Sequence, residues 1–172
     1  MAGQGRAPAP SEAETDVLVD RLKERLYATI TMIAVVVGLA YGHAGPTGAV
    51  ATVLTAALGL WLAALVADQQ AHRTVHGRFA TGRELRRMLH VSSPLLSCAV
   101  GPLVLTGLAA LDVLSLYAAL LVSAGVQVAS LFGWGWTAGR RMGGGTLLPL
   151  LAGFVDAVIG AAVALVKAAA GH

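Results

Sequence analysis

The chain has 172 residues, of which 56% are hydrophobic and only 12% are charged, whereas soluble domains carry about 25% charged residues. This composition excludes an ordinary soluble domain. It favours one all-α membrane domain, because long, continuous apolar stretches suit helices that cross a bilayer, whereas a barrel alternates in polarity. The net charge of +3 comes without a basic stripe interleaved with aromatic residues, so nucleic acid is not expected as a partner.

The N-terminal segment differs from the rest of the chain. Residues 1–10 are rich in Gly, Ala and Pro and are predicted to be disordered, so that the membrane domain covers 11–172. Leucines recur at four-residue spacing around the charged stretch 16–25, which predicts a short charged helix that lies along the cytoplasmic interface and runs into the first apolar stretch.

Five apolar stretches predict five transmembrane helices with a polar cytoplasmic segment, 68–93, between the second and the third. We expect Ser93 and Pro94 to cap and open the third helix, and Asp112 to cap the fourth. The five stretches are 26–42, 46–67, 94–111, 113–136 and 146–168.

The basic residues predict the orientation. Four Lys or Arg precede the first stretch, five lie in 68–93 and two lie between the fourth and fifth stretches, which places eleven on one side. Lys167 alone lies on the other side. Because cytoplasmic loops are enriched in Lys and Arg, we expect the N-terminus in the cytoplasm and the C-terminus outside. The abundance of Arg, Ala and Gly favours a bacterial plasma membrane as the location.

The segment 68–93 contains a second amphipathic pattern. Thr81 and Glu84 have capping-box spacing, and apolar residues then follow on one face. We expect a short basic helix on the anionic inner leaflet, with docking of a protein partner as the alternative. The predicted basic patch on the inner face consists of Arg83, Arg86, Arg87, Arg140 and Arg141.

Asp156 is the only acidic residue inside the predicted spans, and it lies ten residues into the fifth, about 15 Å deep. A carboxylate at that depth needs a partner, water, a cation or a proton. Gln127 on the fourth span has a similar calculated depth, so we expect the two side chains to form a hydrogen bond. The pair is either a proton- or cation-binding site or a packing contact with Asp156 protonated.

Pro102 falls inside the third predicted span. Proline has no N–H, so the carbonyl of Cys98 four residues earlier loses its helical partner. The break is either a simple kink or the source of a carbonyl ligand in a polar cavity.

Asp68, His72 and His76 are spaced by four residues and share a face if the second helix continues into the cytoplasm. Such a face either binds a transition metal or is solvated helix surface.

Small residues recur at helical spacing, for example at Gly125, Ala129 and Gly133, and this pattern allows close helix packing and a homodimer. No nucleotide-binding, hydrolase or metalloprotease motif is present in the sequence, so neither an enzyme nor a cofactor is expected.

A glycine-rich, basic turn that includes Gly139, Arg140 and Arg141 precedes the last of the five predicted spans. In this turn and in the five-span layout, the C-terminal half resembles the vacuolar iron transporter family. The family's Asp-Gly in the first span is absent here, and Asp68 stands where the family carries a Glu. The resemblance implies a five-helix membrane fold.

Two hypotheses for the function follow. In the first, the protein is a small transporter-like protein for a cation or protons, with Asp156 as the charged site and Gln127 as its partner. In the second, it is a scaffold or accessory subunit that binds a protein partner through its basic cytoplasmic face.

Overall fold

The computed structural model describes residues 12–143 and 145–170, and the described chain is helical without any β-strand. The predicted disordered segment 1–10 lies outside these residues. Six helices follow in order: α1 (Glu12–Ala40), α2 (Pro46–His76), α3 (Arg83–Ser97), α4 (Val100–Ala110), α5 (Leu116–Met142) and α6 (Leu147–Ala170).

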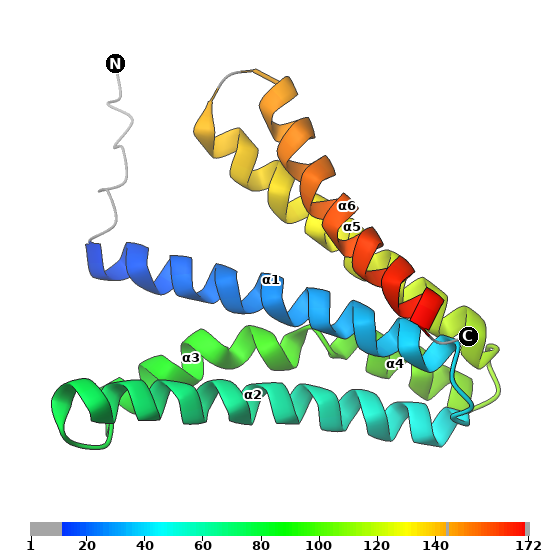
Figure 1. Cartoon of the computed structure of the whole chain (residues 1–172), viewed down its shortest axis with the longest axis horizontal. Helices are drawn as coiled ribbons and strands as arrows, with labels where there is room; N and C mark the ends of the chain where they lie inside the picture. The colour runs from blue at the N-terminus through cyan, green and yellow to red at the C-terminus, as the bar shows by residue number, and fades with distance from the viewer. Residues whose placement is uncertain (1–11, 144, 171–172) are drawn as a thin grey trace, which may run out of the picture.

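The helices form two groups. Helices α1 and α2 and the α3–α4 pair lie side by side (Figure 1). Helices α5 and α6 form an antiparallel hairpin that packs on α1, and the end of the hairpin with the α5–α6 turn points away from α1 (Figure 1). The α1–α2 and α4–α5 connections lie at one end with the end of α6, and the α2–α3 turn lies at the other end with the start of α1 (Figure 1).

Helix α1 lies at the centre of the bundle and packs against α2, α3, α5 and α6. Its side chains Met32, Ile33 and Val36 are fully buried and form one hydrophobic cluster with residues that include Val53 of α2 and Leu131 of α5. The first predicted span therefore supplies the largest share of this cluster, four of its ten buried residues.

Three helices, α2, α5 and α6, are long and apolar enough to cross a membrane, and α3 with α4 makes a fourth if this pair, bent by 40°, is one span. The apolar part of α1, residues 26–40, is only about 22 Å long at 1.5 Å per residue, and charged residues precede it directly. The structure thus supports a helical membrane protein with three to four spans, and it does not confirm the predicted five.

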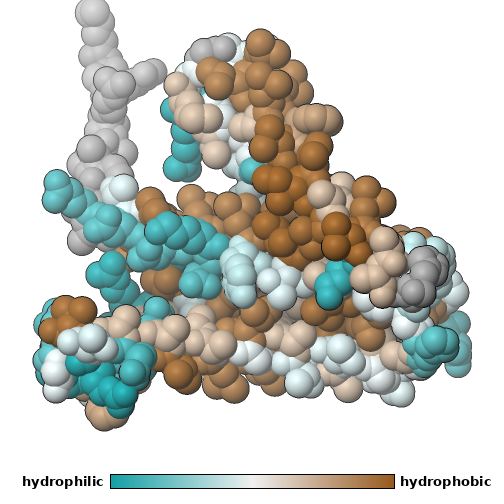
Figure 2. All heavy atoms as spheres, viewed as in Figure 1, coloured by the Kyte–Doolittle hydropathy of each residue, from teal (hydrophilic) through white to brown (hydrophobic). Residues whose placement is uncertain are grey.

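The outer surface fits a lipid environment. Large apolar side chains are exposed along the outer faces of α2, α5 and α6, among them Leu62, Val122 and Phe154. In Figure 2 hydrophobic residues cover much of the α5–α6 hairpin, whereas hydrophilic residues gather on the first half of α1 and at the α2–α3 turn. Exposed apolar faces of this kind suit contact with lipid tails rather than with water.

The charged stretch 16–25 runs into the first apolar stretch as expected, and the two form one continuous helix, α1. A boundary of α3 differs from the prediction. Helix α3 runs without interruption through Ser93 and Pro94, so the prediction that the third span begins there is wrong. Pro94 leaves the carbonyl of His90 without a backbone donor, and the Ser93 hydroxyl donates to that carbonyl at 2.8 Å instead.

The predicted helix caps are also replaced. Gly82, with a φ of 57°, is the N-cap of α3 and makes no side-chain cap, while Glu84 pairs with Arg78. Ser115 caps α5 by accepting a hydrogen bond from the N–H of Ala118 at 3.3 Å. Asp112 lies in the preceding turn with a φ of 57°.

Candidate functional site

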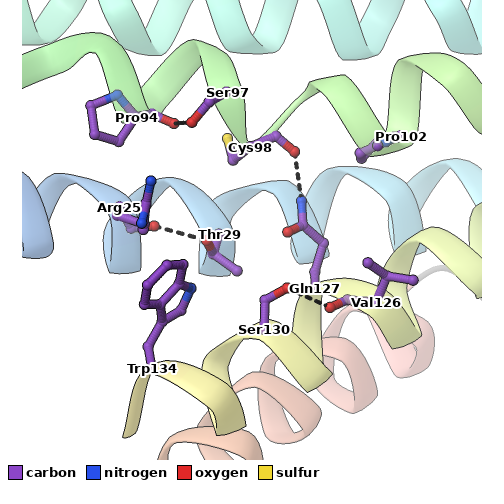
Figure 3. Close-up of a pocket in the computed structure, with 11 residues that line it drawn as sticks. Arg25, Thr29, Pro94, Ser97, Cys98, Pro102, Val126, Gln127, Ser130 and Trp134 are labelled. Carbon is purple, nitrogen blue, oxygen red and sulfur yellow. Dashed lines mark hydrogen bonds between the residues drawn. The ribbon is translucent and has the colours of Figure 1, made fainter. Parts of the chain in front are cut away.

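Three of the predicted site residues meet where α3 ends and α4 begins. The α-helix is interrupted at Cys98 and Ala99, and Pro102 lies in the first turn of α4. The Nε2 of Gln127 on α5 donates a hydrogen bond to the carbonyl of Cys98 at 2.8 Å (Figure 3). Gln127 therefore supplies the donor that Pro102 cannot.

A cavity of about 260 Å³, here named the break cavity, lies at this point between α1, the α3–α4 break and α5. Figure 3 shows its lining side chains, most of which are polar or small. The residues that line it are Arg25, Thr29, Pro94, Ser97, Cys98, Gly101, Pro102, Val126, Gln127, Ser130 and Trp134.

The hydroxyl groups of the break cavity are already used as donors. Thr29 donates to the carbonyl of Arg25 at 2.8 Å, Ser97 to that of Pro94 at 2.9 Å, and Ser130 to that of Val126 at 2.8 Å. Their oxygen lone pairs remain available to accept hydrogen bonds.

Asp156 does not belong to the break cavity, and the predicted hydrogen bond between Gln127 and Asp156 is not formed. Asp156 is half-buried at the contact of α6 with α5, where a Cβ added to Gly135 would lie 2.6 Å from its Oδ2. Within the described chain, Asp156 has neither a hydrogen-bond nor an ion-pair partner.

The register of the α5–α6 hairpin explains this difference. Helix α5 continues to Met142, beyond the predicted end at 136, so its turn comes later in the chain. Asp156 consequently lies level with Gly135, which is about 12 Å along the helix from Gln127.

A second cavity, of about 670 Å³, lies between the first half of α1, the polar end of α2 and the start of α3. We name it the acidic vestibule, because four carboxylates from three helices line it alongside only two basic side chains. The carboxylates are Asp20, Glu24, Asp68 and Glu84, the basic residues are Lys23 and Arg87, and the imidazoles are His72 and His76.

Three carboxylates of the acidic vestibule, Glu24, Asp68 and Glu84, have altered proton affinities, and all three lie beyond the apolar stretches. Burial, with a contribution from the charges of Asp68 and Asp20, raises the pKa of Glu24. Burial and the charge of Asp20 raise the pKa of Asp68. Hydrogen bonds from Arg78, at 2.6 and 2.8 Å, lower the pKa of Glu84. The negative charge of Glu84 is therefore compensated by Arg78, whereas Glu24 and Asp68 lie close to other negative charges.

His72 lies nearly buried in the wall of the acidic vestibule. Its side chain is 9% exposed, and its Nε2 has no hydrogen-bond partner although Glu84 Oε2 lies 3.5 Å away. The ring of His76 stacks on that of His72 with centroids 4.3 Å apart. The two histidines and Asp68 thus line one cavity, but no three His, Cys, Asp or Glu side chains of the described chain converge as metal ligands.

The predicted basic patch is divided in two. Arg83, Arg86 and Arg87 are exposed on the first turns of α3. Arg140 and Arg141 are exposed at the end of α5, which Figure 1 shows well apart from the start of α3.

The comparisons with known proteins do not assign the chain to a family. No family model matches the chain, and no curated protein or solved structure is significantly similar to it. The resemblance to the vacuolar iron transporters stays a prediction, and the function has to be argued from the two cavities.

Several cavity residues were missed from the sequence. The sequence does not predict that Arg25 and Trp134 lie together, although the guanidinium carbon of Arg25 lies 4.2 Å from the centre of the Trp134 ring. Nor does it distinguish Glu24 from the other charges of the stretch 16–25. A signal was present in Ser97 and Ser130, which are polar residues at the edge of or within apolar stretches.

Proposed function

We propose that the protein transports a small cation or protons across a membrane, and that the acidic vestibule is where the cation is collected. The observation that supports this proposal is the gathering of four carboxylates from α1, α2 and α3 around one cavity that also contains the buried Nε2 of His72, which has no hydrogen-bond partner and lies 3.5 Å from Glu84 Oε2. An excess of negative charge in a recess concentrates cations.

The pKa directions agree with this proposal. A carboxyl whose pKa is raised in the folded protein has a charge that is poorly compensated, and an incoming proton or cation compensates it. Because protons compete for Glu24 and Asp68, the apparent affinity for a metal cation falls as the pH falls through their raised pKa values. The absence of a converging ligand set in the described chain favours a hydrated cation or a proton over a tightly coordinated metal.

Asp156 is the second element of the proposal. It is the only acidic residue in α5 or α6, and it has no partner in the described chain. A carboxylate on a membrane helix is costly unless it exchanges a proton or a cation, so we assign it the intramembrane step of transport.

The test is ion flux in proteoliposomes that contain the purified protein and a pH-sensitive or a divalent-cation-sensitive dye. Wild-type protein is expected to support flux, and both Asp68→Asn and Asp156→Asn should reduce it by roughly tenfold or more, since a lost charge removes the interaction with the ion. Asp112→Asn is the matched control: Asp112 lies in an exposed turn with a positive φ, which Asn adopts readily.

Two results would contradict the proposal. One is wild-type protein that moves neither protons nor divalent cations. The other is flux in Asp156→Asn and Asp68→Asn equal to that of the control.

The alternative function, a scaffold that binds a partner through α3, is supported by the exposed side chains of Arg83 and Arg86, which have no ion pair in the described chain. A co-purifying protein that is lost when Arg83, Arg86 and Arg87 are changed to Glu, with no flux in the wild type, would favour it.

A further inference from the structure

The break cavity has the opposite charge to the acidic vestibule. Arg25 is the only charged residue among those that line it, and no carboxylate of the acidic vestibule reaches it. Arg25 also makes no ion pair with any described residue. An unpaired guanidinium at the edge of a membrane bundle needs either water or an anion.

The position of Arg25 is fixed at one end of the cavity. Its guanidinium carbon stacks over the Trp134 ring at 4.2 Å, and Figure 3 shows the two side chains next to each other there. Stacking uses the flat face of the guanidinium, so its N–H edge stays free to bind a ligand.

The other polar side chains that line the break cavity use their donors elsewhere, so the free N–H donors lie at the Arg25 end. The hydroxyls of Thr29, Ser97 and Ser130 donate to carbonyls of their own helices, and the Gln127 amide donates to the carbonyl of Cys98. These groups mainly offer oxygen acceptors to the cavity, which suits the hydrogens of water molecules. A negative group therefore finds its donors at Arg25.

We propose that the break cavity binds a small anion at Arg25, with water filling the rest of its volume of about 260 Å³. The end of α3 and the start of α4 both face the cavity, so the opposite partial charges of the two helix ends largely cancel. The charge of the ligand is therefore set by Arg25. This proposal rests on a different cavity from the proposed cation site and does not depend on transport.

Cys98 makes the proposal testable, because it is the only cysteine of the chain and lines the same cavity. The rates at which an anionic and a cationic methanethiosulfonate of similar size modify the purified full-length protein are measured by intact mass, each normalised to its rate with glutathione. The anionic reagent is expected to be favoured by roughly tenfold or more, since a charged recess raises the local concentration of opposite charge. Replacing gluconate by chloride at constant ionic strength should slow the anionic reagent.

Matched variants separate charge from structure. Arg25→Gln should bring the two normalised rates together, and Arg25→Lys should keep most of the difference. Lys23→Gln should leave the preference unchanged, because Lys23 lies on the same helix but lines the acidic vestibule. If Arg25→Gln does not fold, the wild-type preference and the chloride effect still decide the matter.

The proposal is overturned if Cys98 reacts with neither reagent, or if the two normalised rates in the wild type are equal. It is also overturned if a preference persists in a folded Arg25→Gln protein, or if chloride gives no protection.

Discussion

Gln127 and Pro102 act together, because the side chain of one replaces the backbone donor that the other lacks. The carbonyl of Cys98 accepts a hydrogen bond of 2.8 Å from the Nε2 of Gln127. Ser93 does the same for the carbonyl of His90, which Pro94 leaves open. Each proline in the α3–α4 region is thus matched by a polar side chain that restores the lost hydrogen bond.

This pairing can be measured with a double-mutant cycle. Gln127→Leu should lower the free energy of unfolding by about 1 kcal/mol, the size of a hydrogen bond between membrane helices. In a Pro102→Ala background the cost should shrink, because the new N–H can reach the carbonyl of Cys98. The measurement is chemical unfolding in detergent. Ser130→Ala is the control, since its hydroxyl bonds only within α5. Equal costs of Gln127→Leu in both backgrounds would contradict the pairing.

At the scale of the elements, the α5–α6 hairpin depends on glycines that the predicted small-residue pattern did not include. A Cβ at Gly139 would lie 2.5 Å from the Cα of Pro149, and one at Gly135 would lie 2.6 Å from the carbonyl oxygen of Ala152. Gly125 and Gly133, which the pattern did include, have nothing within 4 Å of an added Cβ. The close contact is therefore made by another face of α5.

We expect Gly139→Ala to separate α5 from α6 and to cost about 1–3 kcal/mol of stability, because backbone atoms stand where the methyl group would go. Gly133→Ala on the same helix should be neutral or stabilise the protein by up to about 1 kcal/mol, since Ala is the better helix former and the site is open. Thermal unfolding in detergent compares the two. A Gly139→Ala protein as stable as Gly133→Ala would show that the hairpin is not packed as described.

At the scale of the whole molecule, α1 differs from α2, α5 and α6 in the short length of its apolar part. It nevertheless packs against α2, α3, α5 and α6 and lies antiparallel to α2 (Figure 1). A central helix surrounded by others can remain within the bundle with less apolar length than a lipid-facing helix requires, because its neighbours cover its backbone.

Labelling of a cysteine introduced into the α1–α2 connection tests whether α1 crosses the membrane. We expect His43→Cys, placed in a Cys98→Ser background, to be labelled in intact cells by a membrane-impermeant maleimide, because the eleven-to-one distribution of basic residues places this connection outside. The control is Thr81→Cys in the α2–α3 turn, which should be labelled only after the cells are opened. Labelling of residue 43 only in opened cells would mean that α1 does not cross.

The sequence by itself determined the class of this protein, because hydropathy and charge are local properties of the chain. Continuous apolar stretches separated by basic loops predict a helical membrane protein, and the missing N–H of Pro102 predicts an open carbonyl at Cys98 without knowledge of the fold.

Only the tertiary structure decided which side chains meet. Counting residues gives an approximate depth but not the direction in which a side chain points around its helix, and the added turns of α5 moved Asp156 away from Gln127 and toward Gly135. The acidic vestibule needs residues from α1, α2 and α3 that are as much as 64 positions apart, from Asp20 to Glu84. Such a gathering depends on helix packing, which no local pattern encodes.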